Sequence, residues 1–366
     1  MNRRQWLCRA GLASTAAALP RWSGGTTPRP SSPYTIGTRI RLRGNENPYG
    51  PSPAALDAMA AVRTAGNRYA VQPASALEAH ITEREGLTPD HVLLTHGSFE
   101  VLGLVAQVYV RPGTEVIKPD PTFGVLGDHA EVLGATVHRV PLTTTHAHDL
   151  GAMEERLNGQ TSVVYVCNPN NPTGTLIDAD TLRAFCKRVQ PQALVLVDEA
   201  YHEYVDDPSY ASMVALVHDR QRVLVSRTFS KLYGLAGLRV GYVLGRPDLI
   251  APLRELRAGP ISSTGIAAAT ASLTDHAFIA ESLRRNAAAR AAFYTTLDDL
   301  RLPYVRSHAN FVWVNLGQPY RIMQSYLNER HIEIAGHVEN QWARITIGTD
   351  DEMAALAAAL RTFEAP

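Results

Sequence analysis

The sequence lacks an excess of charge of either sign. Its 366 residues include 35 Lys plus Arg and 35 Asp plus Glu, so the formal net charge is zero. Proteins that bind nucleic acid or a membrane surface usually carry a basic excess or patch, and the composition favours neither partner. With 45% hydrophobic and 19% charged residues, the chain can build a sizeable core, and its length alone predicts about two domains.

Cysteine is also scarce. The chain has three, Cys8, Cys167 and Cys186, without C-x-x-C spacing, and its thirteen histidines show no ligand spacing. We therefore predict no metal site. Because Cys167 and Cys186 lie in strongly patterned segments, we expect free buried thiols, although the sequence leaves a disulfide between them open.

The N-terminal segment lacks the roughly 20 apolar residues that span a membrane. It starts with Arg3–Arg4 and continues as a weakly apolar Ala/Leu/Ser/Thr stretch that ends near Leu19–Pro20. A basic start, a short apolar run and small residues are typical of an export signal, and the arginine pair before Trp6–Leu7 resembles a twin-arginine signal. We predict a signal and linker over residues 1–33 and a periplasmic location. The alternative is a disordered basic tail on a cytoplasmic protein.

Short apolar runs are abundant between Asp90 and Leu244 and alternate with helical patterns. The runs are Val92–Thr95, Glu115–Lys118, Ala135–Val140, Val163–Cys167, Ala193–Val197, Val223–Ser226 and Gly241–Gly245. Several are continuously apolar, as strands buried on both faces of a sheet are. Candidate helices such as Glu100–Val110 and Ala179–Val189 separate them. This alternation predicts an α/β fold with a mainly parallel sheet, in a large domain over residues 66–250.

The pattern changes after Gly245. The expected elements are a long helix over Asp275–Leu300, strands over Asn310–Leu316 and Ala343–Gly348, and a closing helix that begins with the acids at Asp350. Acidic residues favour a helix N-terminus. We expect a smaller C-terminal α+β domain over residues 251–366 and an N-terminal arm over residues 34–65.

Polar or aromatic residues follow five of the seven apolar runs. They are Gly97 and Ser98, Phe123, Asn171 in NPNNPTG, Asp198 and Tyr201 in DEAY, and Lys231 in RTFSK. Ligands bind beyond the carboxyl ends of strands in parallel sheets, and a Gly/Ser turn that opens a helix presents N–H groups to an anion. Each residue alone is ordinary turn chemistry, but together they predict a binding site.

Three motifs carry a family resemblance. NPNNPTG, LVDEAY and SRTFSKLYGLAGLRVGY resemble, in order and spacing, the fold-type-I pyridoxal-phosphate (PLP) aminotransferases. NENPYGPS, NRYA and ARITIG narrow the resemblance to the histidinol-phosphate aminotransferase branch, from about Arg39 to the C-terminus. The resemblance implies the type-I PLP-transferase fold, the cofactor PLP and transamination.

The resemblance assigns roles around the cofactor ring. Lys231 would bond to the cofactor aldehyde and move the substrate proton, which suits a lysine of lowered pKa. Asp198 would pair with the ring nitrogen. Tyr201 and Asn171 would bind the phenolic oxygen, and Phe123 would stack on the ring.

The resemblance also implies a phosphate site and a partner subunit. The phosphate would lie on Gly97 and Ser98, with Thr228, Ser230 and Arg239 completing the site. An arginine binds phosphate through two N–H groups. In addition, Tyr69 resembles the tyrosine that reaches a neighbouring subunit's cofactor phosphate, which implies a homodimer.

At the substrate end, Arg344 resembles the arginine that binds the substrate α-carboxylate, and Asn47 and Tyr49 resemble residues that border the substrate pocket. One departure concerns Ala335, which stands where this branch commonly carries an arginine for the substrate's phosphate. Arg41, Arg43 or His337 would have to replace that arginine, so the amino donor stays open.

The resulting hypothesis is a ping-pong aminotransferase that moves an amino group from an amino acid, or an amine such as histidinol phosphate, to a 2-oxo acid. Two alternatives stay open: a decarboxylase or lyase similar to the phosphothreonine decarboxylases, and a PLP-binding regulatory protein without turnover. We interpret Glu46 and Glu100 as turn or helix acids without a catalytic role.

Overall fold

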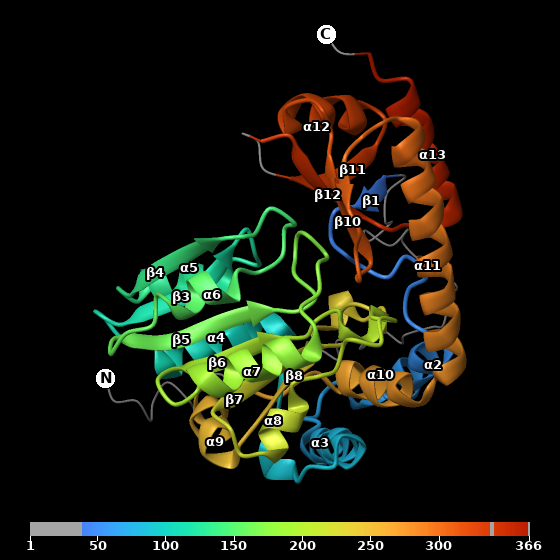
Figure 1. Cartoon of the computed structure of the whole chain (residues 1–366). Helices are drawn as coiled ribbons and strands as arrows, with labels where there is room; N and C mark the ends of the chain where they lie inside the picture. Colours follow the sequence, from blue (N-terminus) through green and yellow to red (C-terminus); the bar gives the residue numbers. More distant parts are fainter. Residues whose placement is uncertain (1–38, 337–339, 365–366) are drawn as a thin grey trace, which may run out of the picture. The chain divides into compact units, whose positions relative to one another are not determined.

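The structure, a computed structural model, describes residues 39–336 and 340–364 (Figure 1). The predicted signal and linker, and His337, lie outside these residues. From Arg39 on, the chain forms one compact unit, and the domain boundaries at residues 65 and 250 stay a prediction. None of the described helices is long and apolar enough to cross a membrane.

A seven-stranded sheet is the larger of the two sheets, with strand order β2-β8-β7-β6-β5-β3-β4. Its strands are β2 (Val92–Thr95), β3 (Glu115–Asp120), β4 (Thr136–Pro141), β5 (Thr161–Cys167), β6 (Leu194–Asp198), β7 (Val223–Thr228) and β8 (Gly241–Gly245). β7, β6, β5, β3 and β4 are parallel, whereas β8 runs antiparallel to both of its neighbours. The predicted mainly parallel sheet is confirmed, and all seven apolar runs are strands.

Helices cover both faces of this sheet (Figure 1). They are α3 (Val71–Glu85), α4 (Ser98–Tyr109), α5 (Val125–Val132), α6 (Leu150–Glu154), α7 (Ala179–Val189), α8 (Val214–His218), α9 (Pro247–Leu256) and α10 (Ser263–Thr274); α2 (Pro53–Ala61) packs on α10. In β5, Val163 and Tyr165 belong to the core formed with α4, α5 and α9, whereas Val164 and Val166 belong to the core formed with α3, α7 and α8. Burial on both faces is why these strands are continuously apolar.

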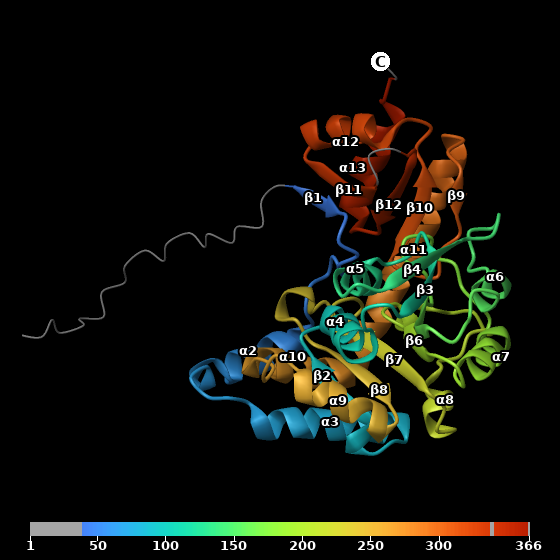
Figure 2. The same cartoon turned by 90° about the vertical axis from the view of Figure 1, so that its left-hand side faces the viewer.

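A five-stranded sheet contains the C-terminal strands, in the order β1-β11-β12-β10-β9. Its strands are β1 (Ile40–Leu42), β9 (Tyr304–Val305), β10 (Phe311–Asn315), β11 (Ile332–Gly336) and β12 (Trp342–Thr346). It packs with α11 (His276–Asp299), α12 (Tyr320–Glu329) and α13 (Asp350–Arg361). β1 pairs in parallel with β11, so the N-terminal arm is part of this sheet (Figure 2).

Two local expectations are confirmed. The closing helix α13 begins at Asp350, where Thr349 and Glu352 form a capping box, a reciprocal pair of bonds that satisfies free N–H groups. Cys167 and Cys186 are buried free thiols, and burial raises the pKa of Cys186 to about 12.

Candidate active site

Successive side chains of β6 and β7 point to opposite faces of the sheet. This alternation separates the polar side chains at the carboxyl ends of the two strands into two sets. Leu194 and Leu196 face the core beneath α4, so Asp198 faces the same side, and Glu199 faces the opposite side. The same period places Thr228 of β7 on the Asp198 side and Arg227 on the Glu199 side. One face therefore receives the candidate catalytic groups, and the other receives a buried ion pair.

A cavity of about 350 Å³ lies at the Asp198 side. It is lined by Gly44, Asn45, Glu46, Ser98, Phe99, Phe123, Cys167, Asn171, Asp198, Ala200, Tyr201, Ser230, Lys231, Ala236, Gly237, Arg239 and Arg344. The structure thus brings together eight predicted site residues from strand ends and one, Arg344, from β12 of the other sheet.

Lys231 projects into this cavity. Its Nζ donates a hydrogen bond to the Gly44 carbonyl at 3.1 Å and lies 5.7 Å from the Tyr201 ring centroid. Burial and, next, the Arg344 charge lower the pKa of Lys231 to about 8. A lysine near this pKa is partly neutral at physiological pH, as an amine nucleophile and proton carrier must be.

Asp198 has one satisfied and one unsatisfied oxygen. Its Oδ2 accepts a hydrogen bond from the Tyr165 hydroxyl at 3.0 Å, whereas Oδ1 is buried and has no hydrogen-bond partner among the described residues. Burial raises the pKa of Asp198 to about 6. A buried carboxylate with an unpaired oxygen needs a cationic donor beside it.

Tyr201 lies between the two sheets. Its hydroxyl accepts hydrogen bonds from Asn45 Nδ2 at 2.9 Å and from Asn171 Nδ2 at 3.3 Å. The ring packs edge-on against Phe311, with 5.1 Å between centroids. Burial raises the pKa of Tyr201, so the phenol stays protonated and can donate its O–H to an acceptor in the cavity.

An anion site is formed where α4 begins. Ser98, Ser230 and Arg239 line the cavity there, and Arg239 Nη1 lies 3.3 Å from Ser230 Oγ. Gly97, with φ of +78°, allows the close approach, since a Cβ on Gly97 would collide with the Arg239 guanidinium. Behind the lining, Thr228 Oγ1 accepts a hydrogen bond from the Ser230 N–H at 3.1 Å. A helix N-terminus, two hydroxyls and a guanidinium suit a phosphate.

Arg344 of β12 also lines the cavity. Its Nη1 donates to Asn171 Oδ1 at 2.7 Å and Nη2 donates to the Arg43 carbonyl, while Nε is buried without a partner among the described residues. Burial, and then the Arg43 charge, lower the pKa of Arg344. An unsatisfied guanidinium N–H here suits a ligand carboxylate.

The remaining predicted residues lie outside the lining. Tyr69 is 82% exposed. Asn47 is buried and donates to the Leu232 carbonyl at 2.7 Å, so it braces the loop after Lys231. Tyr49 lies under the Arg285 guanidinium, 4.9 Å from ring centroid to Cζ. The position of Ala335 is next to the site, because Ala335 of β11 pairs with Arg344 of β12.

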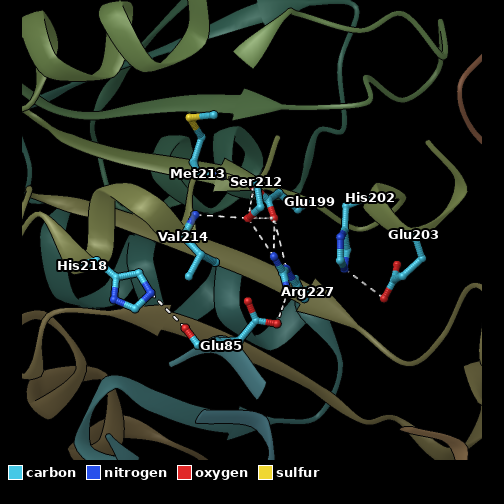
Figure 3. Close-up of polar contacts among 9 residues, drawn as sticks. All are labelled: Glu85, Glu199, His202, Glu203, Ser212, Met213, Val214, His218 and Arg227. Carbon is cyan, nitrogen blue, oxygen red and sulfur yellow. Dashed lines mark hydrogen bonds and ion pairs between the residues drawn. The ribbon is translucent and has the colours of Figure 1, made fainter. Parts of the chain in front are cut away.

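The opposite face of β6 and β7 holds a buried network (Figure 3). Arg227 donates to Glu199 at 3.0 Å, to Glu85 at 2.8 Å and to Ser212 at 2.7 Å. Glu199 also accepts from the Met213 N–H at 2.8 Å. Glu199 follows Asp198, and Arg227 precedes Thr228, so this network fixes the two strand ends that carry the site.

Sequence reasoning missed three residues of the site. Tyr165 orients Asp198, and its only signal was a tyrosine within the apolar run VVYVC. Asn45 holds the Tyr201 hydroxyl from the N-terminal arm, a contact between residues 156 positions apart. Glu46, interpreted as a turn acid, lines the cavity. Glu100 instead lies 2.9 Å from His96 Nδ1 and accepts the His96 N–H, which agrees with a helix acid.

The site fits PLP on its own chemistry. The unpartnered Asp198 Oδ1 suits a protonated ring nitrogen, and the Ser98, Ser230 and Arg239 group suits a phosphate. Lys231 supplies an amine for the aldehyde, and Phe123 adds an aromatic side chain to the same lining. The described residues contain no group of three His, Cys, Asp or Glu placed to hold a metal ion.

Comparisons with known proteins agree with this geometry. Residues 38–360 match the family model described as aminotransferase class I and II. The chain is 37% identical over 333 residues to a histidinol-phosphate aminotransferase of Moorella thermoacetica, covering 88% of this chain and 84% of that protein. It is 38% identical over 330 residues to histidinol-phosphate aminotransferase 2 of Ralstonia nicotianae, covering 88% of each.

A solved structure shares the fold. Histidinol-phosphate aminotransferase of Sinorhizobium meliloti, in complex with pyridoxal-5'-phosphate, superposes with a TM-score of 0.82 at 28% identity, over 88% of this chain and 90% of that one. The expected type-I PLP-transferase fold, a large α/β part with a smaller C-terminal α+β part, is confirmed, as is the expected cofactor. By its sequence, its fold and its site, the chain belongs to the aminotransferase class I and II family, whose members use PLP.

Proposed function

We propose that this PLP-dependent aminotransferase takes its amino group from an α-amino acid, or from an amine such as histidinol phosphate, and delivers it to a 2-oxo acid. The main support for this proposal is that three groups surround one cavity: Lys231, Asp198 Oδ1 and Arg344 Nε, the last two without a hydrogen-bond partner among the described residues. The names of the relatives support histidinol phosphate as one donor to test.

Bound PLP supplies an aldehyde that combines with amines and a ring that withdraws electrons from the substrate Cα. The chain's own residues do the rest. Asp198 pairs with the ring nitrogen and keeps it protonated. Tyr201 and Asn171 bind the phenolic oxygen, and Ser98, Ser230 and Arg239 bind the phosphate. Lys231 Nζ takes the proton from the substrate Cα and returns it, as its lowered pKa allows.

Arg344 selects the substrate by its carboxylate. The side chain is held by Asn171 and the Arg43 carbonyl, so its guanidinium is oriented before substrate arrives. A carboxylate that accepts from this guanidinium places the substrate amine toward Lys231. For histidinol phosphate, which has no carboxylate, the phosphate would take this place.

The assembly and the location are part of the proposal. We propose a homodimer in which Tyr69 reaches the partner's cofactor phosphate, supported by its 82% exposure and the family resemblance.

We also propose export to the periplasm, supported by the Arg3–Arg4 pair and the short apolar run after it. Fractionation of cells that express the chain, with and without Arg3→Lys and Arg4→Lys, tests the location; retention of both forms in the cytoplasm contradicts it.

A half-reaction screen tests the substrate. The purified holoenzyme is mixed with single amino acids and with histidinol phosphate, without an oxo acid, and the cofactor absorbance is followed from the pyridoxal to the pyridoxamine form. We expect conversion by at least one donor, release of the matching oxo product and no carbon dioxide. Lys231→Ala should abolish the conversion, and Lys187→Ala, an exposed lysine, should not. Release of carbon dioxide, or conversion by no donor, would overturn the proposal.

A further inference from the structure

One charged residue of the cavity has no part in binding the cofactor or moving the proton. Binding of the cofactor and the substrate carboxylate and movement of the proton use Lys231, Asp198, Arg239 and Arg344. Glu46 lines the same cavity and is not needed for any of these steps. We propose that Glu46 is a specificity-determining residue that binds a cationic side chain of the amino donor, such as an ammonium, guanidinium or imidazolium group. The inference rests on the proposed function, because it concerns the donor of that reaction.

The position of Glu46 is fixed by its neighbours in the chain. The Asn45 N–H donates to Thr346 Oγ1 at 2.9 Å, and Asn47 Nδ2 donates to the Leu232 carbonyl at 2.7 Å. Glu46 therefore stands between two buried anchors, one on β12 and one on the loop after Lys231. A side chain held in this way needs little reorganisation when it binds a ligand.

The carboxylate lies at the Lys231 end of the cavity. A Cβ built on Gly44 would lie 3.1 Å from Glu46 Oε2, so the carboxylate folds over Gly44, whose carbonyl accepts from Lys231. The electrostatic effect of Glu46 on the pKa of Lys231 exceeds that of Asp198. Glu46 is thus close to the amine that reacts, and its side chain is partly exposed at the cavity lining.

Glu46 retains binding capacity. Its Oε1 accepts from Arg41 at 3.0 Å, and its Oε2 has no hydrogen-bond partner within residues 39–336 and 340–364. The side chains of Glu46 and Arg41 are 35% and 49% exposed, and exposed ion pairs of this kind are weak. A substrate cation can therefore bind Oε2 beside Arg41 or displace Arg41.

The pairing of charges in the cavity defines the donor class. Arg344 offers a cation to the α-carboxylate, and Glu46 offers an anion to a second group of the same molecule. An α-amino acid with a cationic side chain satisfies both. A neutral side chain leaves Oε2 of Glu46 unpaired, and an acidic one is repelled.

The test compares donors that differ in one charge. Single-turnover rate constants divided by donor dissociation constants are measured for lysine and norleucine, and for arginine and citrulline, with holoenzyme. We expect the wild type to prefer the cationic member of each pair. Glu46→Gln should reduce this preference about tenfold, since a charge-assisted hydrogen bond is replaced by a neutral one, and should leave norleucine and citrulline nearly unchanged.

Two further variants control the experiment. Arg41→Gln removes the competing cation and should raise the preference for lysine, by up to about fivefold. Glu255→Gln, at an exposed glutamate of α9 outside the cavity lining, should change nothing. An effect of Glu46 on Lys231 itself alters both members of a pair equally and cancels in the ratio.

The outcomes separate the two hypotheses. If neither an amino acid nor histidinol phosphate converts the cofactor, the proposed function fails. If histidinol phosphate converts it and no amino acid does, only the donor proposal is wrong. If the wild type converts both members of each pair at similar rates, or if Glu46→Gln slows both equally, the donor proposal is wrong while the proposed function stands. Loss of cofactor absorbance in Glu46→Gln would show that Glu46 supports the fold rather than the donor, and would also overturn the proposal.

Discussion

At the scale of single residues, Lys231 is held where its ammonium form is disfavoured. Burial, and after it the Arg344 charge, lower its pKa to about 8. Only the neutral amine attacks an aldehyde. The rate at which cofactor-free enzyme regains covalent PLP absorbance should therefore rise about tenfold per pH unit and level off above about pH 8.

Arg344→Gln tests the cause. Removing this positive charge raises the pKa of Lys231, so the level part of the pH profile should begin at higher pH. Arg183→Gln, on the surface of α7, should leave the profile unchanged. If Arg344→Gln does not move the profile, then Arg344 does not act on the charge of Lys231.

Asp198 predicts a pH dependence of stability. Its pKa in the folded, cofactor-free protein is about 6, against an ordinary value of 3.8. A pKa shift of one unit corresponds to about 1.4 kcal/mol of folding free energy. The pKa of Asp198 is higher in the folded than in the unfolded state, so this group lowers the free energy of unfolding very little below about pH 4. As the pH rises from about 4 through 6, the unfolded chain releases this proton more readily than the folded protein, and stability is lost. Asp198→Asn should then stabilise the cofactor-free protein by up to about 3 kcal/mol at pH 7 and by little at pH 4.

Urea unfolding of the cofactor-free proteins at both pH values measures this difference. The exposed Asp57→Asn serves as the control and should show no such pH-dependent gain. With PLP bound, the order should reverse, because the ring nitrogen then pairs with the Asp198 carboxylate and not with an amide. An equal gain at both pH values would mean that Asp198 is not buried as a charged group.

At the scale of secondary-structure elements, the network around Arg227 joins the end of α3 to the ends of β6 and β7 (Figure 3). Arg227 and Glu199 are 3% and 1% exposed. Removing one member of a buried ion pair leaves an unpaired charge and costs about 3–5 kcal/mol. We expect Arg227→Met to lower the free energy of unfolding by this amount and to weaken PLP binding.

A double-mutant cycle identifies the cause. Glu199→Gln combined with Arg227→Met should recover part of the loss, since no unpaired charge at Glu199 remains. Arg183→Met breaks a surface pair with Asp180 and should cost less than about 1 kcal/mol. If the double variant is as unstable as the sum of the single variants, the two side chains are not coupled.

The sequence predicted the elements well where burial gives a clear pattern. The runs at Val92–Thr95 and Gly241–Gly245 are strands with those bounds, because both faces of each are buried. The direction of β8 was not predictable, since an apolar run reads the same in either direction. β1 has only three residues and pairs with β11, about 290 positions away, so no local sequence pattern predicts this strand.

The motifs predicted residues that the fold brings to one cavity, and the exceptions have physical reasons. Asp198, Lys231 and Arg344 line one cavity as expected. Tyr165 looked like an ordinary core residue, because its ring is buried and only its hydroxyl reaches Asp198. Asn47 lies outside the cavity lining, since its amide is used to hold the Leu232 carbonyl and Ser282, contacts that depend on the fold and not on neighbouring residues.

At the scale of the whole molecule, the cavity depends on segments from both ends of the chain. The arm supplies Gly44–Glu46, β12 supplies Arg344, and the seven-stranded sheet supplies the residues around Lys231. Because β1 pairs with β11 next to β12, the arm and Arg344 are positioned by the same sheet. A change that weakens β1 should therefore weaken substrate binding more than it weakens cofactor binding.

A homodimer would extend this dependence to a second chain. Three apolar side chains of the α2–α3 region are strongly exposed: Leu56 at 50%, Tyr69 at 82% and Val71 at 65%. A contiguous patch of exposed apolar groups marks a protein–protein contact, and a partner that packs on this region would cover these side chains. If Tyr69 completes the partner's phosphate site, the Tyr69→Ala enzyme should bind PLP about tenfold more weakly and sediment as a dimer.

Mixing inactive variants tests this arrangement. Tyr69→Ala and Lys231→Ala subunits, dissociated and reassociated together, should form hybrid dimers in which one site has both Lys231 and the partner's Tyr69. At PLP concentrations too low for Tyr69→Ala alone, random mixing should restore about a quarter of wild-type activity, because half of the dimers are hybrids with one complete site. The matched control mixes Lys231→Ala with Asp198→Ala. Both residues line the cavity of one chain. Each hybrid of this control therefore has one site without Lys231 and one site without Asp198, and it should stay inactive. No recovery in the test mixture would show that Tyr69 acts within its own subunit, whereas recovery in the control would show that restored activity does not depend on Tyr69.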